Sequence, residues 1–283
     1  MARKRANLSD LLNNLTFRKT FDKWKLLACS HFEYDGLPDG IEARHIENFL
    51  FEHGKAIFFR AKGMGFMCLE AQNGGNLNVY GDPLGYWANG FQFHEWVDSD
   101  DCVIIENNPH RLNTKDFVLF YVNKLTEAER TMDVNVKAVK TPYIISCDDR
   151  DVLTLKQIFR EIDGNTPAIF TSKKLNVDAL KVLLTGANFL GNDLMDYKKS
   201  VENDLLTFLG FNNIAVDKKE RLNVDEANSN NELISGFAEL QLSSRQLALD
   251  RINEKWGLHI TVRLKGVSDD VDNEPIQDDE ADR

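Results

Sequence analysis

The chain has 283 residues, of which 42% are hydrophobic, and this is enough to bury one large core or two smaller ones. Its formal net charge of -11 argues against a simple nucleic-acid coat protein, because affinity for phosphate comes mainly from clustered Lys and Arg. No apolar stretch approaches the roughly 20 residues of a membrane-spanning helix, so we expect no membrane segment.

The charge is distributed unevenly along the chain. The N-terminal end is basic and begins with Arg3, Lys4 and Arg5, whereas the last residues, 266–283, are almost uniformly acidic. For the basic arm two interpretations are equally open, a solvated terminus or an electrostatic tether to nucleic acid. A segment of like charge with few apolar residues buries too little surface to offset the entropy of ordering, so we expect residues 266–283 to form a disordered acidic tail.

Apolar residues that recur at spacings of three and four predict an amphipathic helix over residues 8–33, directly after the basic arm, so that residues 1–33 form one segment. Glycines and a proline between Gly36 and Gly40 break this pattern, and a short helix is expected over residues 41–53. Between Ala56 and Ile105 short aromatic and β-branched runs alternate with glycine-rich turns. This pattern predicts a small β-rich module over these residues.

Two long helices are predicted in the middle of the chain. The first follows Asn113 or Thr114 as its N-cap and runs to about Lys140, and the second follows Asn192 as its cap and stops at Gly210. Between them, after Pro142, the chain forms a small unit of strand, helix and strand, expected at residues 143–145, 152–162 and 167–170.

A long polar segment follows the second helix. Residues 214–232 are charged and lack apolar periodicity, which predicts a long functional loop, since structureless connections of this length are uncommon in compact domains. Its Lys218, Lys219 and Arg221 are interspersed with acidic residues, so a screened surface is the simplest interpretation unless a ring repeats each lysine around a centre. Residues 233–265 then form a helix, with Ser243 or Ser244 as an internal cap, and one strand.

Signatures of catalysis are missing from the sequence. The chain has no phosphate-binding loop, no nucleophile elbow and no pair of histidines at zinc-ligand spacing. The four cysteines are scattered, which predicts buried free thiols in a reducing compartment. We therefore expect no enzyme activity, no catalytic residue, no metal site and no cofactor.

Several short runs resemble the connector, or upper collar, protein of the phi29-like short-tailed phages, in order and in spacing. The runs are Lys140–Pro142, Leu153–Gln157, Gly164–Phe170, Thr207–Gly210, Lys218–Arg221 and Ile252–Glu254. The similarity is strong over residues 139–265 and weaker but collinear before them.

The resemblance implies an α+β phage portal fold assembled as a ring. On that template residues 113–140 and 189–213 are stem helices and residues 141–188 are a small α/β clip. Residues 34–112 and 233–265 form a β-rich wing, and residues 214–232 are a channel loop.

The resemblance also implies a function. The subunit would form a dodecameric channel at one head vertex, for packaging and ejection of double-stranded DNA and for joining head to tail. Its expected partners are further copies of itself, DNA in the channel, a separate packaging ATPase, the major capsid protein, a lower collar or tail protein and, where the phage uses one, a packaging RNA. Arg3, Lys4 and Arg5 match the family's contact with RNA or motor, and Lys218 and Lys219, with Arg221 beside them, match its channel-loop contact with DNA.

These expectations place the protein in the virion, at the head–tail vertex, and in the host cytoplasm during assembly. The nearest alternative is a head–tail adaptor ring without a packaging role, which has less need of a long loop. Two further alternatives are a nuclease or terminase subunit and a basic-arm nucleic-acid-binding protein. The first lacks its metal-carboxylate motifs, and the second would not need long helices around a small clip.

Overall fold

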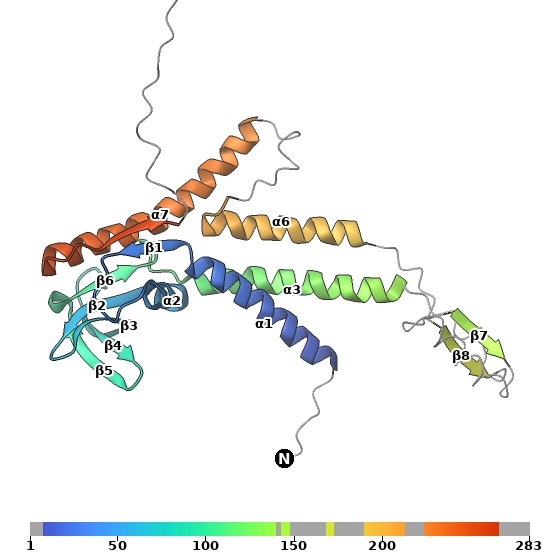
Figure 1. The fold of residues 1–283 in the computed structure, drawn as a ribbon, viewed down its shortest axis with the longest axis horizontal. Helices are drawn as coiled ribbons and strands as arrows, with labels where there is room; N and C mark the ends of the chain where they lie inside the picture. The colour runs from blue at the N-terminus through green and yellow to red at the C-terminus, as the bar shows by residue number, and fades with distance from the viewer. Residues whose placement is uncertain (1–7, 140–142, 148–167, 173–189, 213–223, 266–283) are drawn as a thin grey trace, which may run out of the picture. The chain divides into compact units, whose positions relative to one another are not determined.

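A computed structural model describes residues 8–139, 143–147, 168–172, 190–212 and 224–265. The chain divides into two compact bodies (Figure 1). The smaller body comprises residues 1–17 and 123–202, and the larger body comprises residues 18–122 and 203–283. Both bodies contain helices and strands, so the expected α+β class is confirmed.

Within the described ranges, a long helix comes first, a run of mainly β-strands follows, and three more long helices come after it with short strands between and after them. The elements are α1 (Leu8–Cys29), β1 (Phe32–Asp35), α2 (Ala43–His53), β2 (Lys55–Ala61), β3 (Gly65–Leu77), β4 (Pro83–Gly90), β5 (Phe93–Asp98), η1 (Ser99–Asp101), β6 (Cys102–Glu106), α3 (Thr114–Val139), β7 (Tyr143–Cys147), β8 (Ala168–Ser172), α6 (Gly191–Leu209), α7 (Val224–Trp256) and β9 (Thr261–Leu264).

A five-stranded antiparallel sheet forms the centre of the larger body. Its strand order is β5-β4-β3-β2-β6, which confirms the predicted β-rich module. Strand β2 is buried on both faces: Ala56 and Phe58 face a core shared with α2 and α7, whereas Ile57 and Phe59 face a second core. Buried residues of all five strands make up this second core.

The first predicted helix is too long at its C-terminal end. α1 ends at Cys29, and Phe32–Asp35 forms β1, which pairs antiparallel with β9 so that Phe32 lies opposite Leu264. The helical spacing continues into these residues in the sequence, but pairing with a strand at the other end of the chain overrides it. Local propensity is a weak prior where tertiary pairing buries a residue such as Phe32.

The predicted loop 214–232 is too long as well. α7 begins at Val224, so residues 224–232 are helical. Once the apolar residues from Ile234 to Ile252 anchor the helix on the core, each added residue gains one hydrogen bond, and polar residues extend it. Ser243 and Ser244 do not cap a helix, because both hydroxyls donate to the Leu240 carbonyl within α7, at 3.3 and 3.0 Å.

The two predicted long helices are confirmed as α3 and α6. The side-chain oxygen of Asn113 accepts a hydrogen bond from the Asp116 amide at 3.0 Å, which confirms it as the cap of α3. In the smaller body, α3 and α6 are joined by an ion pair between Glu129 and Lys198 and by a bond from the Leu190 amide to Asn135.

Strands β7 and β8 of the smaller body pair in parallel, with Tyr143 opposite Ala168. A parallel pair needs a crossover connection, which agrees with the predicted strand–helix–strand unit, although the expected helix at residues 152–162 lies outside the described residues. None of the helices in the described ranges combines the length and the apolar character needed to cross a bilayer.

Candidate functional site

The residues singled out by the sequence all lie outside the described part of the chain. These are Arg3, Lys4, Arg5, Lys218, Lys219 and Arg221. The structure does describe both ends of the lysine-containing segment, since α6 ends at Leu209 and α7 begins at Val224. The candidate site is therefore built from the part of the larger body that holds these two helix ends.

Gly210 terminates α6 and sets the direction in which the chain leaves it. Its φ of 79° lies in the left-handed region, which favours glycine. The Phe211 amide donates to the Leu206 carbonyl at 2.9 Å and the Gly210 amide donates to Thr207 at 3.1 Å, as in the common C-terminal helix cap. A Cβ at Gly210 would lie 2.8 Å from that of Ala238, so α6 and α7 touch here with no room for a side chain.

Aromatic rings hold the same junction from several elements. Phe208 stacks on Phe117 of α3 with ring centroids 4.3 Å apart and tilts against Phe237 of α7 at 5.6 Å. One residue beyond the glycine, Phe211 packs on His31 at 4.1 Å. Such aromatic pairs stabilise by about 0.5–1.5 kcal/mol each beyond the area that they bury, so the end of α6 is firmly fixed.

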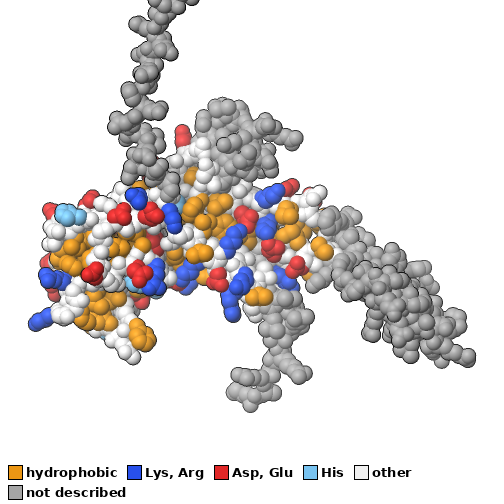
Figure 2. Space-filling model, viewed as in Figure 1, with side chains coloured by type: hydrophobic (Ala, Val, Ile, Leu, Met, Phe, Trp, Pro, Cys, Tyr) orange, Lys and Arg blue, Asp and Glu red, His pale blue; other side chains and the backbone are white. Residues whose placement is uncertain are grey.

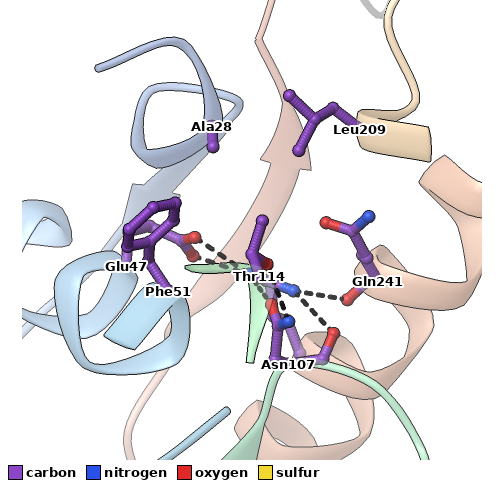
Figure 3. A pocket seen from close by; sticks show the side chains of 8 residues that line it. Ala28, Glu47, Phe51, Asn107, Thr114, Leu209 and Gln241 are labelled. Atoms are coloured by element: carbon purple, nitrogen blue, oxygen red, sulfur yellow. Dashed lines mark hydrogen bonds and ion pairs between the residues drawn. The ribbon is translucent and has the colours of Figure 1, made fainter. Parts of the chain in front are cut away.

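A buried arginine fixes α7 to the rest of the larger body, and its partners Glu47, Asn107 and Gln241 are labelled in Figure 3. Arg245 is 1% exposed, and its Nε and Nη2 atoms donate to the two carboxylate oxygens of Glu47 in α2 at 2.8 and 2.9 Å. Nη2 also donates to the side-chain oxygen of Asn107 at 3.0 Å, and Nη1 donates to the Asn107 and Gln241 carbonyls. The planar guanidinium thus joins α7, α2 and the end of β6 in one geometry.

Two neighbours extend this network to β1 and α3. The Tyr34 hydroxyl donates to Glu47 at 2.6 Å, and the Arg245 guanidinium lies over the ring of Phe32 at 4.0 Å. The Asn107 side-chain amide donates to the Leu112 carbonyl and to the Thr114 hydroxyl, at the start of α3. The orientation of α3 at its first turn is therefore linked to that of α7.

Burial and the buried charges shift the pKa values of Tyr34, Arg245 and His31. Burial raises the pKa of Tyr34 well above its usual range, and the charge of Glu47 raises it further. Burial acts to lower the pKa of Arg245, but the charges of Glu47 and Tyr34 and the hydrogen bonds to them together outweigh it, so that the net pKa is raised. For His31, burial and the positive charge of Arg245 lower the pKa to about 4, so the ring against Phe211 is neutral near pH 7.

The network holds α2, α7, the end of β6 and the start of α3 in place. The small cavity of Figure 3 is lined by Ala28, Glu47, Phe51, Asn107, Thr114, Leu209, Gln241 and Arg245. Its charged groups are bonded to each other, and within the described ranges no group of three His, Cys, Asp or Glu side chains could hold a metal ion.

Comparison with known proteins agrees with the resemblance in the sequence. The sequence model of the Phage Connector (GP10) family matches residues 2–267, which is nearly the whole chain. The chain belongs to the phage connector family. It is therefore a phage connector, or portal, protein and a structural component of the virion.

Individual relatives are also portal proteins. The connector is 25% identical over 176 residues to the portal protein of Staphylococcus phage 44AHJD, a match that covers 60% of this chain and 70% of that protein. Among solved structures it is similar to a chain of the portal and tail of native bacteriophage P68, with 16% identity, 94% of each chain covered and a TM-score of 0.48. It is also similar to an HK97 family phage portal protein from Corynebacterium diphtheriae, with 11% identity, 91% and 94% of the chains covered and a TM-score of 0.39.

The network around Arg245 is the part of the connector that sequence reasoning missed. Its members come from distant segments, and no local motif joins them. One signal was present, since Arg245 occupies a position of α7 whose neighbours at helical spacing, Ala238, Leu249 and Ile252, are apolar and buried. A charge on the apolar face of a helix predicts a buried partner, although the sequence does not say which.

Proposed function

We propose that the connector assembles as a dodecameric ring around a channel for double-stranded DNA, at one vertex of the phage head. The observation that carries this proposal is the match of residues 2–267 to the connector family. In this ring the subunit passes DNA during packaging and ejection and joins the head to the tail. Its contacts are with further copies of itself, the major capsid protein and a lower collar or tail protein.

Electrostatics gives the channel two roles. Each subunit carries a net charge of -11, and repetition around the ring repels DNA from the wall and keeps friction low. Lys218, Lys219 and Arg221 supply a local hold on the DNA, because charge contacts screened by salt act only over about 8–10 Å. DNA can then move through the channel and still be retained at the loop.

A loop that holds DNA needs fixed ends, and the larger body supports this role. The cap at Gly210, its contact with Ala238 and the aromatic rings around Phe208 fix the end of α6 before the loop. The buried Arg245 fixes α7 after it. A force on the loop is therefore resisted at the packed end of α6 and, along α7, by the buried face that begins at Ile234.

The connector is proposed to be a passive channel rather than an enzyme. A separate packaging ATPase hydrolyses ATP, and the arm formed by Arg3, Lys4 and Arg5 binds this motor or a packaging RNA. Deletion of residues 2–5 should abolish the salt-sensitive binding of RNA by the isolated ring. Undiminished binding would reject this role of the arm.

The ring itself is tested by native mass spectrometry of the purified protein, together with end-on views in negative stain. We expect a closed ring of about a dozen subunits with a central hole. A stable monomer or dimer at high protein concentration would contradict the proposal.

The loop is tested by the variant Lys218→Ala/Lys219→Ala. The ring should still form, and filled heads should lose packaged DNA, because the local hold is removed. Lys62→Ala, in the turn between β2 and β3, is the control and should retain DNA. Equal retention in the two variants would refute a role of the loop lysines.

A further inference from the structure

Helix α7 has an apolar face that the rest of the described chain leaves exposed. Its buried face contains Ile234, Ala238, Arg245, Leu249 and Ile252. On the opposite face, Leu233, Leu240 and Leu247 are 59%, 47% and 54% exposed. Residues seven positions apart follow one line along a helix, as in the seam of a coiled coil. In Figure 2, hydrophobic side chains gather where α7 passes the C-terminal end of α6.

A glycine lies on the same face of α7. Gly236 falls between Leu233 and Leu240, and a Cβ added there would meet no atom of the described chain within 4 Å. Glycine in a helix interior is less stable than alanine, so a helix gains nothing from it unless another backbone must approach closely. The described part of the single chain gives no such reason at Gly236, but a second helix packed on the leucines does. We call Leu233, Gly236, Leu240 and Leu247 the leucine seam.

Helix α1 carries a face of complementary character. Leu26 is 72% exposed, whereas Trp24 on the other side of the helix is 2% exposed. Lys23 and Lys19 lie one and two turns before Leu26 on this side, and both are exposed. Asp22, four positions before Leu26, is exposed beside them, so that this side carries two basic residues and one acidic residue. We call Lys19, Lys23 and Leu26 the basic face of α1.

The charges beside the leucine seam have the opposite sign. Glu232 and Glu239 are exposed, lie seven positions apart and flank the seam along one side. An apolar line with acidic residues beside it on α7 thus matches an apolar residue with basic residues beside it on α1. Complementary charges of this kind fix partner choice and register in helix pairs.

We propose that the leucine seam of one subunit packs against the basic face of α1 in the next subunit of the ring. The inference rests on the proposed ring and names the surface that closes it. A ring needs a heterologous contact, in which each copy uses two different surfaces, and these two faces supply such a pair. The occupant of the seam is thus a second copy of this chain.

The first test places charge in the seam with the variants Leu233→Lys and Leu240→Lys. Both side chains are exposed in the single chain, so tryptophan fluorescence should show unchanged folding. The concentration at which the ring dissociates, measured by native mass spectrometry over a dilution series, should rise about tenfold or more. Met64→Lys, which is also 59% exposed but lies between β2 and β3, is the control and should leave the ring unchanged.

Gly236→Leu separates packing from helix stability. Leucine is a better helix former than glycine, so this variant should raise the melting temperature of the dissociated chain. It should also weaken the ring, because the added side chain would meet the neighbouring helix. A variant that stabilises the chain and leaves the ring intact would overturn the proposal.

Charge reversal tests α1 as the partner. Lys19→Glu/Lys23→Glu and Glu232→Lys/Glu239→Lys should each weaken the ring, and a chain that carries all four changes should regain it. If the seam variants weaken the ring but the combined reversal does not restore it, the assignment of α1 is wrong. If wild-type rings form and every variant forms them equally well, this inference fails and the proposed function stands, whereas a wild-type monomer would refute the proposed function itself.

Discussion

Replacing Arg245 by Met leaves the carboxylate of Glu47 buried without its cation. Glu47 is 2% exposed, and it would keep the hydrogen bond from the Tyr34 hydroxyl at 2.6 Å. Asn107 and Gln241 would also lose the guanidinium as a donor. Breaking a buried ion pair by removing one partner costs about 3–5 kcal/mol, because the remaining charge is uncompensated.

This loss should be visible as unfolding of the larger body. A change of about 3–5 kcal/mol corresponds to a fall of roughly 10 °C in melting temperature, at about 2–4 °C per kcal/mol for a body of this size. All four tryptophans lie in the larger body, so their fluorescence during urea and thermal unfolding reports on it. Arg251→Met, at an exposed arginine of the same helix, is the matched control and should change stability by less than about 0.5 kcal/mol.

A second substitution tests the cause of the loss. Adding Glu47→Gln to the Arg245→Met variant removes the uncompensated charge, so it should recover part of the stability. The difference between the single and double variants measures the energy of the buried charge. A loss below about 1 kcal/mol for Arg245→Met, or a double variant no more stable than the single one, would refute the electrostatic reasoning.

Three further predictions concern other groups of the larger body. The folded pKa of His31, about 4, lies below its usual 6.5, so the unfolded chain binds more protons between these values and stability falls as the pH drops through this window. The loss in free energy of unfolding should be roughly 2–3 kcal/mol after solvent screening. The variant His31→Phe should make the urea midpoint less dependent on pH. An unchanged pH dependence would exclude His31 as its source. Burial raises the pKa of the Cys68 thiol to about 12, so iodoacetamide at pH 8 should not modify Cys68 in the native protein. The reagent should alkylate this thiol after unfolding, and mass spectrometry measures both outcomes. Alkylation of Cys68 in the native protein would contradict its burial. Gly210→Ala should lower the free energy of unfolding in urea by about 1–3 kcal/mol, and by more than Gly257→Ala does. Both glycines have positive φ, but only an alanine at position 210 would meet Ala238. Equal losses in the two variants would mean that the contact with Ala238 has no energetic effect.

The local features of the fold could be predicted from the sequence. Apolar spacing and caps located α3 and α6, including the cap at Asn113 and the stop at Gly210, and the aromatic and β-branched runs predicted a β-rich module and located its strands β2 and β6. The order and spacing of short motifs indicated the connector family, which the family match confirms. Such signals are readable because a helix cap or an apolar period depends on residues only a few positions apart.

The candidate site was predictable only in part. The sequence placed the end of α6 at Gly210, but it did not predict that Ala238 touches this glycine or that Phe211 packs on His31. It also extended the loop into residues that form the first turns of α7, since their polar character carries no apolar period. Lys218, Lys219 and Arg221 remain a prediction.

Only the tertiary structure decided which distant segments meet. β1 is a strand because Phe32 pairs with Leu264, and Arg245 is tolerated on an apolar face because Glu47 and Asn107 lie opposite it. The sequence by itself determined the long helices α3 and α6, a β-rich module and the family, since hydrophobic period and turn chemistry are local. Pairing partners and buried charges follow from contacts between residues far apart in the chain, where many alternatives have similar local propensity and only the packed core selects one.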